Sequence, residues 1–219
     1  MKNVRIWFKK DNECRYISHL DLNRVMLRAL HKSGIPIWHT EGFNPHPFAT
    51  FPLPLSLGFR GTNEIMDVKL TDDDYSFKEI IDRLNECLPG GLVVEKVTEP
   101  VMKAGKVAYA AFIIEIFCDT ASPEVVGREL KTLLDSESIT VEKKSKRGMK
   151  TIDIKPGIKT AEVTVSADKV VLETILAAGS SDNINPNLIL KTLEERSGFD
   201  CYTVITRYEL FDAELAPFR

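Results

Sequence analysis

The chain has 219 residues, of which 43% are hydrophobic and 28% are charged, the balance of an ordinary globular protein. No apolar run is long enough to span a bilayer, and the first residues show a strand-like pattern in place of the apolar core of a signal peptide. These features argue against export and against membrane insertion. We therefore expect a cytoplasmic protein with one large domain or two small ones.

The formal net charge of −3 hides an uneven distribution along the chain. Residues 1–60 carry nine Lys/Arg against four Asp/Glu, and residues 141–160 carry seven against two. The segments between and after them are acidic. If the fold brings the two basic segments together, they would form one surface for a polyanion such as RNA.

The first hundred residues alternate between strand and helix patterns. Residues 3–9 alternate as a strand, and residues 18–33 have the period of an amphipathic helix. Ser18 is a good N-cap for this helix, and Asp21 supplies the acidic half of a capping box. The remaining predicted elements are a strand at 35–40, a loop at 41–55, a strand at 64–70, a helix at 72–88 and a strand at 92–97. This β-α-β-β-α-β order is that of the ferredoxin-like fold.

The second half of the sequence begins a similar cycle. Its predicted elements are a strand at 107–118, a helix at 123–134, a strand at 139–142, strands at 158–166 and 169–177, a helix at 186–196 and a strand at 201–211. The sequence thus predicts an α+β protein with two ferredoxin-like lobes, residues 1–103 and 104–219. The second lobe would have an extra β-hairpin.

The first candidate site lies at the start and along one face of the helix at 18–33. It contains Arg15, Tyr16, His19, Arg24 and Arg28. The free N–H groups of the first helical turn favour an anion, the arginines supply positive charge, and the tyrosine could stack on a base. The alternative is a capped helix with a solvated basic face.

The second candidate site is the proline-rich loop at 41–55. Two prolines restrict the backbone around Asn44 and His46, whose polar side chains are available for binding. Phe43, Phe48 and Phe51 could stack on bases, or they could fill the core beneath the loop. Because long ordered loops in compact domains usually have a function, we expect this loop to bind a ligand.

The third candidate site is a basic run followed by a short turn. Its residues are Lys143, Lys144, Lys146, Arg147, Lys150 and Lys155. With Gly148 near the centre, the run is typical of a hairpin tip that contacts phosphates. A solvated turn without a binding role is the alternative.

The sequence predicts no catalytic, metal or cofactor site. His19, His39 and His46 lack the spacing of metal ligands, and no carboxylate completes a known site. The four cysteines are separate from one another along the chain, which argues against a local zinc or iron–sulfur site. Cys118 and Cys201 lie in apolar runs and are interpreted as small core residues.

Several segments together resemble the bacterial radical-SAM-linked family of unknown function. They are Arg15-Tyr-Ile-Ser-His-Leu-Asp-Leu with Arg24 and Arg28, Gly42-Phe-Asn-Pro-His-Pro, Pro52-Leu-Pro-Leu-Ser-Leu-Gly58, Asp153-Ile-Lys-Pro156, and Gly179-Ser with Asn185-Pro186. The sequence contains no CxxxCxxC cluster motif, so the resemblance implies the free-standing form that associates with a radical SAM protein. Two positions depart from the family pattern. The resemblance implies a basic residue where this sequence has Phe48, and an arginine where it has Lys155.

Three functions follow from these observations, in order of preference. The first is an accessory RNA-binding module, for tRNA or rRNA, that works with a radical SAM protein. The second is a docking subunit of that protein without RNA contact. The third is a metal-independent ribonuclease that uses His19 or His46. The oligomeric state does not follow from the sequence.

Overall fold

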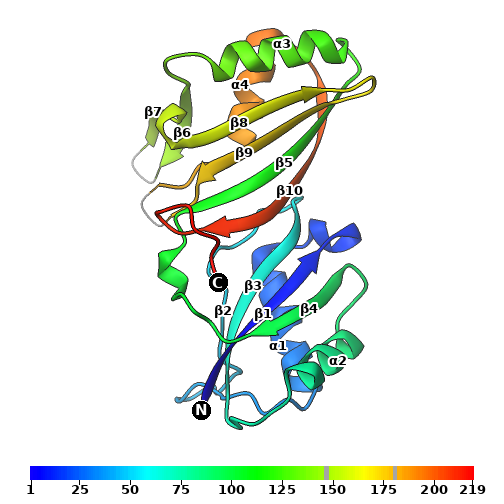
Figure 1. The fold of residues 1–219 in the computed structure, drawn as a ribbon, viewed down its shortest axis with the longest axis vertical. Coiled ribbons are helices and arrows are strands. Elements are labelled where there is room, and N and C mark those ends of the chain that lie inside the picture. The colour runs from blue at the N-terminus through cyan, green and yellow to red at the C-terminus, as the bar shows by residue number, and fades with distance from the viewer. Residues whose placement is uncertain (146–147, 180–181) are drawn as a thin grey trace. The chain divides into compact units, whose positions relative to one another are not determined.

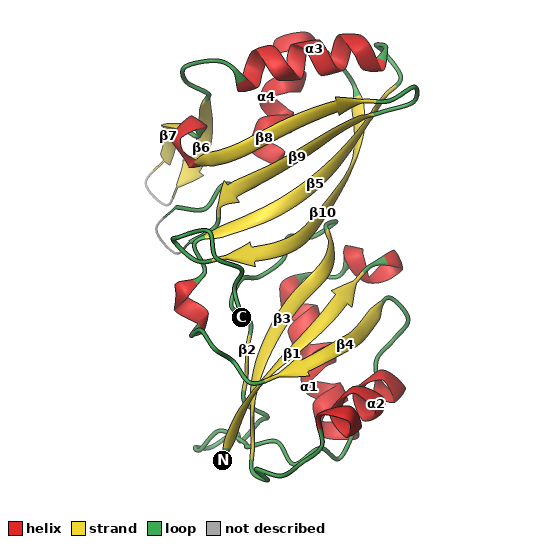
Figure 2. Cartoon of the chain, in the orientation of Figure 1, coloured by secondary structure: helices red, strands yellow, loops and turns green. Residues whose placement is uncertain are grey.

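The computed structural model describes residues 1–145, 148–179 and 182–219. These residues form two compact units (Figure 1). Unit 1 consists of Met1–Val107, Arg207–Glu209 and Pro217–Arg219, and unit 2 of Ala108–Thr206 and Leu210–Ala216. Both units contain helices and strands (Figure 2), so the predicted mixed α+β class is confirmed.

Unit 1 alternates strands and helices along the chain. Its elements are β1 (Lys2–Lys10), the 3-10 helix η1 (Asn12–Tyr16), α1 (His19–Lys32), β2 (Ala49–Thr50), β3 (Arg60–Leu70), α2 (Phe77–Cys87), β4 (Leu92–Thr98) and the 3-10 helix η2 (Ala104–Lys106). The strands follow the order β4-β1-β3, and the short β2 pairs with β3. All three pairings are antiparallel.

The core of unit 1 lies between this sheet and its two helices. Because side chains alternate along a strand, Val4, Ile6 and Phe8 of β1 point to the same face. They meet the buried stripe of α1, which includes Leu22 and Met26. The stripe repeats every three to four residues, as the predicted helix required.

Two predicted elements of unit 1 were wrong, a strand that does not form and a helix that begins later than predicted. Residues 35–40 do not form a strand; they make only isolated bridges such as Ile37 with Leu70, while β2 forms at Ala49–Thr50. Pro36 lacks an N–H donor, which limits pairing in this segment. The helix predicted at 72–88 begins only at Phe77, because the backbone N–H of Asp74 donates to the Asp72 side chain in a turn.

Unit 2 has a similar order of elements with one hairpin inserted. Its elements are β5 (Tyr109–Cys118), α3 (Pro123–Leu134), β6 (Thr140–Ser145), β7 (Gly148–Asp153), the 3-10 helix η3 (Lys155–Gly157), β8 (Ile158–Val165), β9 (Val170–Ala177), α4 (Asn187–Ser197) and β10 (Cys201–Phe211). The strands follow the order β10-β5-β9-β8, while β6 and β7 form a separate two-stranded sheet. The inserted hairpin therefore lies outside the main strand order.

Two details of unit 2 differ from the sequence-based expectation. Helix α4 begins at Asn187, one residue after its predicted start at 186. The side chain of Asn185 accepts a hydrogen bond from the Asn187 N–H at 2.9 Å. Cys118 and Cys201 are only half-buried, so their interpretation as core residues was wrong. They lie at the end of β5 and the start of β10, where the sheet is less covered.

A buried ion pair joins the end of the chain to the sheet of unit 1. Arg207 and Glu64 are almost fully buried, and the Nε of Arg207 donates to the Glu64 carboxylate at 2.9 Å. The same guanidinium donates to the carbonyl oxygens of Leu53 at 2.7 Å and Pro54 at 3.3 Å. Gly61 makes room for this arrangement, because a Cβ there would lie 2.4 Å from the Glu64 side chain.

Lys10 is a second buried cation beside this pair. Its side chain is fully buried, and its ammonium donates to the carbonyl oxygens of Arg15 at 3.4 Å and Ile17 at 3.2 Å. Burial lowers the pKa of Lys10, although the negative charge of Glu64 opposes the shift. The buried charges therefore hold two loop segments, residues 15–17 and 53–54, by their backbone carbonyls.

We predict that replacing Arg207 with methionine strongly destabilises the protein. The substitution leaves Glu64 buried without its partner, which should lower the free energy of unfolding by about 3–5 kcal/mol in urea denaturation. The control is Lys9→Ala, which removes an exposed ion pair with Glu95 at 2.6 Å and should cost about 0–1 kcal/mol. Equal effects of the two substitutions would contradict a structural role for the buried pair.

Candidate nucleic-acid interface

The first turn of α1 is capped by the protein's own side chains. Ser18 accepts a hydrogen bond from the Asp21 N–H at 3.1 Å, and the Ser18 hydroxyl donates to the Asp21 carboxylate at 2.7 Å. This hydrogen bond, followed by that of Arg24, lowers the pKa of Asp21. The carboxylate thus occupies the place where we had expected an external anion, and Arg24 is paired with it at 3.0 Å.

Arg15 and Tyr16 form an exposed pair just before α1. The Arg15 guanidinium lies 4.6 Å from the centre of the Tyr16 ring and also donates a hydrogen bond to its hydroxyl. Tyr16 is 61% exposed, so its ring is accessible to a ligand. An accessible aromatic ring with a guanidinium over it can stack on an unpaired nucleic-acid base.

A pocket of about 220 Å³ lies between the last turns of α1 and the end of α2. It is lined by Val25, Arg28, Ala29, Lys32, Cys87 and Pro89. The lining thus has two cationic side chains and no carboxylate. Neither Arg28 nor Lys32 forms an ion pair with any residue in the described ranges. A small pocket with two such cations is suited to a phosphate group.

His19 faces the interior of unit 1 and does not point into this pocket. Its ring packs edge-on against Phe51 with the ring centres 5.1 Å apart, and its Nδ1 is buried without a hydrogen-bond partner among the described residues. Burial lowers the pKa of His19, and the nearby charges of Lys10 and Arg207 lower it further. The imidazole is therefore neutral near pH 7.

The proline-rich loop is held by backbone hydrogen bonds and by two of its three phenylalanines. Phe48 contacts the ring of Trp38, whereas Phe51 packs on His19 and Phe8. Phe43, in contrast, is fully exposed. Phe48 and Phe51 are thus used in packing, and only Phe43 remains available for stacking on a ligand.

The predicted polar residues of this loop lie at its exposed end. Asn44 and His46 are both exposed. The Nδ1 of His46 lies 3.1 Å from the Thr40 hydroxyl and 3.1 Å from the Asn44 carbonyl oxygen. His46 therefore braces the turn through its Nδ1.

The basic run of unit 2 lies on the β6–β7 hairpin. Lys143 is opposite Lys150, and Lys144 is opposite Met149. Lys150 is exposed. Lys146 and Arg147 lie outside the described residues, and the side chains at 143–147 are likewise not described. The prediction that this run and α1 form one surface joins residues of different units and stays a prediction.

The side chain of Lys155 is bound to the protein's own backbone and is not free on the hairpin. Its ammonium donates to the carbonyl oxygen of Leu134, the last residue of α3, and its backbone N–H donates to the Asp153 side chain at 3.0 Å. A cation at this place satisfies one of the unpaired carbonyl groups at the helix C-terminus. The charge of Lys155 is thereby directed to the protein itself.

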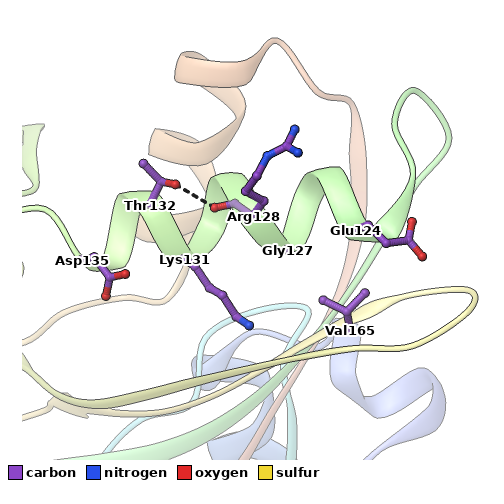
Figure 3. Close-up of a pocket in the computed structure, with 7 residues that line it drawn as sticks. All are labelled: Glu124, Gly127, Arg128, Lys131, Thr132, Asp135 and Val165. Atoms are coloured by element: carbon purple, nitrogen blue, oxygen red, sulfur yellow. Dashed lines mark hydrogen bonds between the residues drawn. The ribbon is translucent and has the colours of Figure 1, made fainter.

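A second pocket, of about 320 Å³, lies along α3 in unit 2 (Figure 3). Lys131 extends from α3 toward the strands, and Val165 of β8 lies on the strand side of the pocket, below the helix in this view. Unlike the pocket on α1, its lining includes the carboxylates of Glu124 and Asp135 beside its cations. This mixed lining is less suited to a polyanion.

Within residues 1–145, 148–179 and 182–219, no group of three or more His, Cys, Asp and Glu residues is placed to hold a metal ion. In the same ranges, no helix combines the length and the apolar character that crossing a membrane requires.

Residues 3–186 match the model of a family described as "Uncharacterized protein conserved in bacteria (DUF2344)". The chain belongs to this family. The match covers the motif segments of unit 1 and most of unit 2, but not Arg207, which lies in the last strand. The family description names no partner, so the link to radical SAM proteins remains a proposal. No curated protein sequence matches the chain.

A solved structure has a similar fold at low sequence identity. A chain of the structure titled "Crystal Structure of a Cbf5-Nop10-Gar1 Complex" matches 94% of this chain with a TM-score of 0.53 and 10% identity. Our chain spans about half, 48%, of the length of that chain. A second match, titled "Crystal Structure of an Unknown Protein from Galdieria sulphuraria", covers 93% of this chain and 98% of that chain at 13% identity, with a TM-score of only 0.28. The first match supports the mixed α+β arrangement.

The sequence-based candidates thus separate into exposed and structural groups. Arg28, Tyr16 and Arg15 lie on the outside of unit 1, whereas His19 and Lys155 make internal contacts. Lys32 was not among the predicted site residues. Its spacing of four from Arg28 places both on one face of α1, and this signal was present in the sequence.

We predict that His19 titrates below its ordinary pKa of about 6.5 and that its titration lowers stability in acid. Because the folded-state pKa is depressed, the unfolded chain binds the proton more tightly. The free energy of unfolding should therefore fall as the pH drops below about 6.5 and level off below the folded pKa. The measurement is urea denaturation from pH 5 to 8, with NMR titration of the imidazole.

The control for this prediction is His19→Gln, which removes the titrating group. Its stability should depend less on pH across the same range than that of the unaltered protein. His31, an exposed residue in the last turn of α1, provides a second control through His31→Gln. An unchanged pH profile in His19→Gln would contradict the assigned environment of His19.

Proposed function

We propose that this protein is an RNA-binding module that works with a radical SAM protein. The observation that supports the RNA part most strongly is the pocket on α1, in which Arg28 and Lys32 converge without a carboxylate in the lining. Most contacts between proteins and nucleic acids are made to the phosphate backbone. Two adjacent cations on an exposed helix face supply such contacts.

The Arg15–Tyr16 pair adds a second kind of contact within the same unit. Phosphate contacts supply affinity without sequence information, whereas a stacked base requires an unpaired nucleotide. The exposed ring of Tyr16 therefore favours RNA with single-stranded loops, such as tRNA or rRNA, over a regular duplex. A bound loop would place its phosphates along the basic face of α1.

We further infer that each unit is a ferredoxin-like lobe. Numbered within its own unit, the strand order is 4-1-3-2 in both cases once the β6–β7 hairpin is set aside. The helices follow the first and third of these strands in each unit. A shared order of strands and helices supports an internal duplication, in which the hairpin is an addition to the second lobe.

Association with the radical SAM protein is proposed from the resemblance of the motif segments to the radical-SAM-linked family. Large apolar side chains within or next to these segments are exposed, namely Phe43 at 106%, Leu20 at 68% and Leu57 at 62%. Exposed apolar side chains are available for contact with a partner protein. They make docking to the radical SAM protein without RNA contact the second candidate function. The double variant Phe43→Ser/Leu20→Ser tests it, because this variant should no longer co-purify with the radical SAM protein.

We predict that the Arg28→Ala/Lys32→Ala double variant binds bacterial tRNA more weakly than the unaltered protein. Each lost phosphate contact releases one counterion fewer, so the slope of log affinity against log salt should become shallower by about 2. Affinity at low salt should fall roughly tenfold or more. Fluorescence anisotropy with labelled tRNA at several salt concentrations measures both quantities.

The matched control is Lys78→Ala on α2, which removes one exposed lysine that is already paired with Asp82. This variant should bind tRNA as the unaltered protein does, because its charge is neutralised by its neighbour. Absence of tRNA binding by the unaltered protein at low salt would contradict the RNA proposal and favour docking. Equal weakening by the control and the double variant would show that binding depends on overall charge alone.

A further inference from the structure

Cys118 and Cys201 lie at neighbouring strand ends in unit 2. Strand β5 ends at Cys118, β10 begins at Cys201, and the two strands are hydrogen-bonded neighbours in the sheet. Both thiols are free and half-buried. Neither has a place in the proposed RNA interface, which lies in unit 1.

The register of these strands puts the two cysteines opposite one another. At the other end of the pair, the Ala108 N–H donates to the Phe211 carbonyl oxygen at 2.8 Å. Counting forward on one strand and backward on the other places Phe117 opposite Tyr202. The two rings do pack together, with their centres 6.2 Å apart. The next pair in this register is Cys118 with Cys201.

This arrangement satisfies the distance requirement of a disulfide. Residues opposite one another on antiparallel strands have Cα atoms about 4.5–5.5 Å apart. Disulfides join residues whose Cα atoms are about 4.4–6.8 Å apart. The Cα spacing expected for this pair therefore lies within the range that a disulfide bridges.

The surroundings make the two thiols chemically different. Burial opposes ionisation of Cys118, but hydrogen bonds from the Thr120 hydroxyl, the Cys201 thiol and the backbone N–H groups of Thr120 and Ala121 outweigh it and lower its pKa. For Cys201, burial and the hydrogen bond to Cys118 raise the pKa to about 12. Cys118 is thus the thiol that ionises and attacks, since the thiolate is the nucleophile.

We propose that Cys118 and Cys201 form a thiol–disulfide exchange site for low-molecular-weight disulfides. The Cys118 thiolate attacks one sulfur of the small disulfide, so that a mixed disulfide forms and one small thiolate leaves. Cys201 then gives up its proton to the released thiolate and attacks the Cys118 sulfur, so that the mixed disulfide breaks and the second small thiolate leaves and takes up the proton that Cys118 lost on ionising. The products are the Cys118–Cys201 disulfide and two small thiols, so the protein is oxidised by two electrons and the small disulfide is reduced by two.

The other two cysteines provide internal comparisons. Cys14 is buried, its thiol donates to the Gly90 carbonyl oxygen at 3.1 Å, and burial raises its pKa. Cys87 lies at the end of α2, far along the chain from the pair. Neither belongs to the cross-strand pair, so the exchange reaction should select Cys118 and Cys201.

The test is incubation of the full chain with oxidised glutathione, followed by mass spectrometry. The unaltered protein should lose the mass of two hydrogens, and peptide mapping should find Cys118 linked to Cys201. In Cys201→Ser, the reaction should stop at a stable mixed disulfide on Cys118. In Cys118→Ser, reaction at Cys201 should be at least about 10-fold slower. Cys87→Ser should behave like the unaltered protein.

A second measurement needs no substitution. Under limiting iodoacetamide, Cys118 should be alkylated before Cys201, and the rate should rise with pH to a midpoint below the usual pKa of a cysteine thiol. The proposal is overturned if Cys201 reacts first, if Cys201→Ser accumulates no mixed disulfide, or if the unaltered protein retains bound glutathione without forming the cross-link.

Discussion

The buried pair between Arg207 and Glu64 is the interaction on which the arrangement of unit 1 depends. Removing two charges from water is costly, and the cost is offset only when the partners are close and their remaining hydrogen bonds are satisfied. The guanidinium meets this condition by donating to Glu64 and to two carbonyl groups of the proline-rich segment. Lys10 does the same for the segment before α1. Two of the segments that resemble the radical-SAM-linked family are thereby held by buried charges, at residues 15–17 and 53–54.

This internal anchoring explains which side chains remain for function. The ring of His19 packs against Phe51 and lies close enough to Lys10 and Arg207 for their charges to lower its pKa, so His19 and Phe51 are used in packing within the unit. Arg24 is neutralised by Asp21 at the helix cap. What stays accessible is a cationic pocket toward the end of α1 and the Arg15–Tyr16 pair before its start. Both kinds of contact are those that single-stranded RNA requires.

Local signals in the sequence predicted much of this structure, whereas contacts between distant segments could not be predicted. The Ser18 cap, helix α3 and the paired strands β8 and β9 all follow from residues close together in the chain. The burial of Glu64 requires Arg207, which is 143 residues away, and no local pattern indicates such a partner. The half-buried state of Cys118 likewise depends on how β10 pairs with β5. The apolar run around Cys118 predicted a core position because it contains no information about this pairing.

We propose that unit 1 presents an RNA-binding surface on and before α1. Ultraviolet crosslinking of the full chain to bacterial tRNA, with mass spectrometry of the crosslinked peptides, tests it most directly. We predict crosslinks at Tyr16 and within residues 24–32, and their loss in competition with excess unlabelled tRNA. Crosslinks confined to other parts of a folded chain, or none at all at low salt, would contradict it.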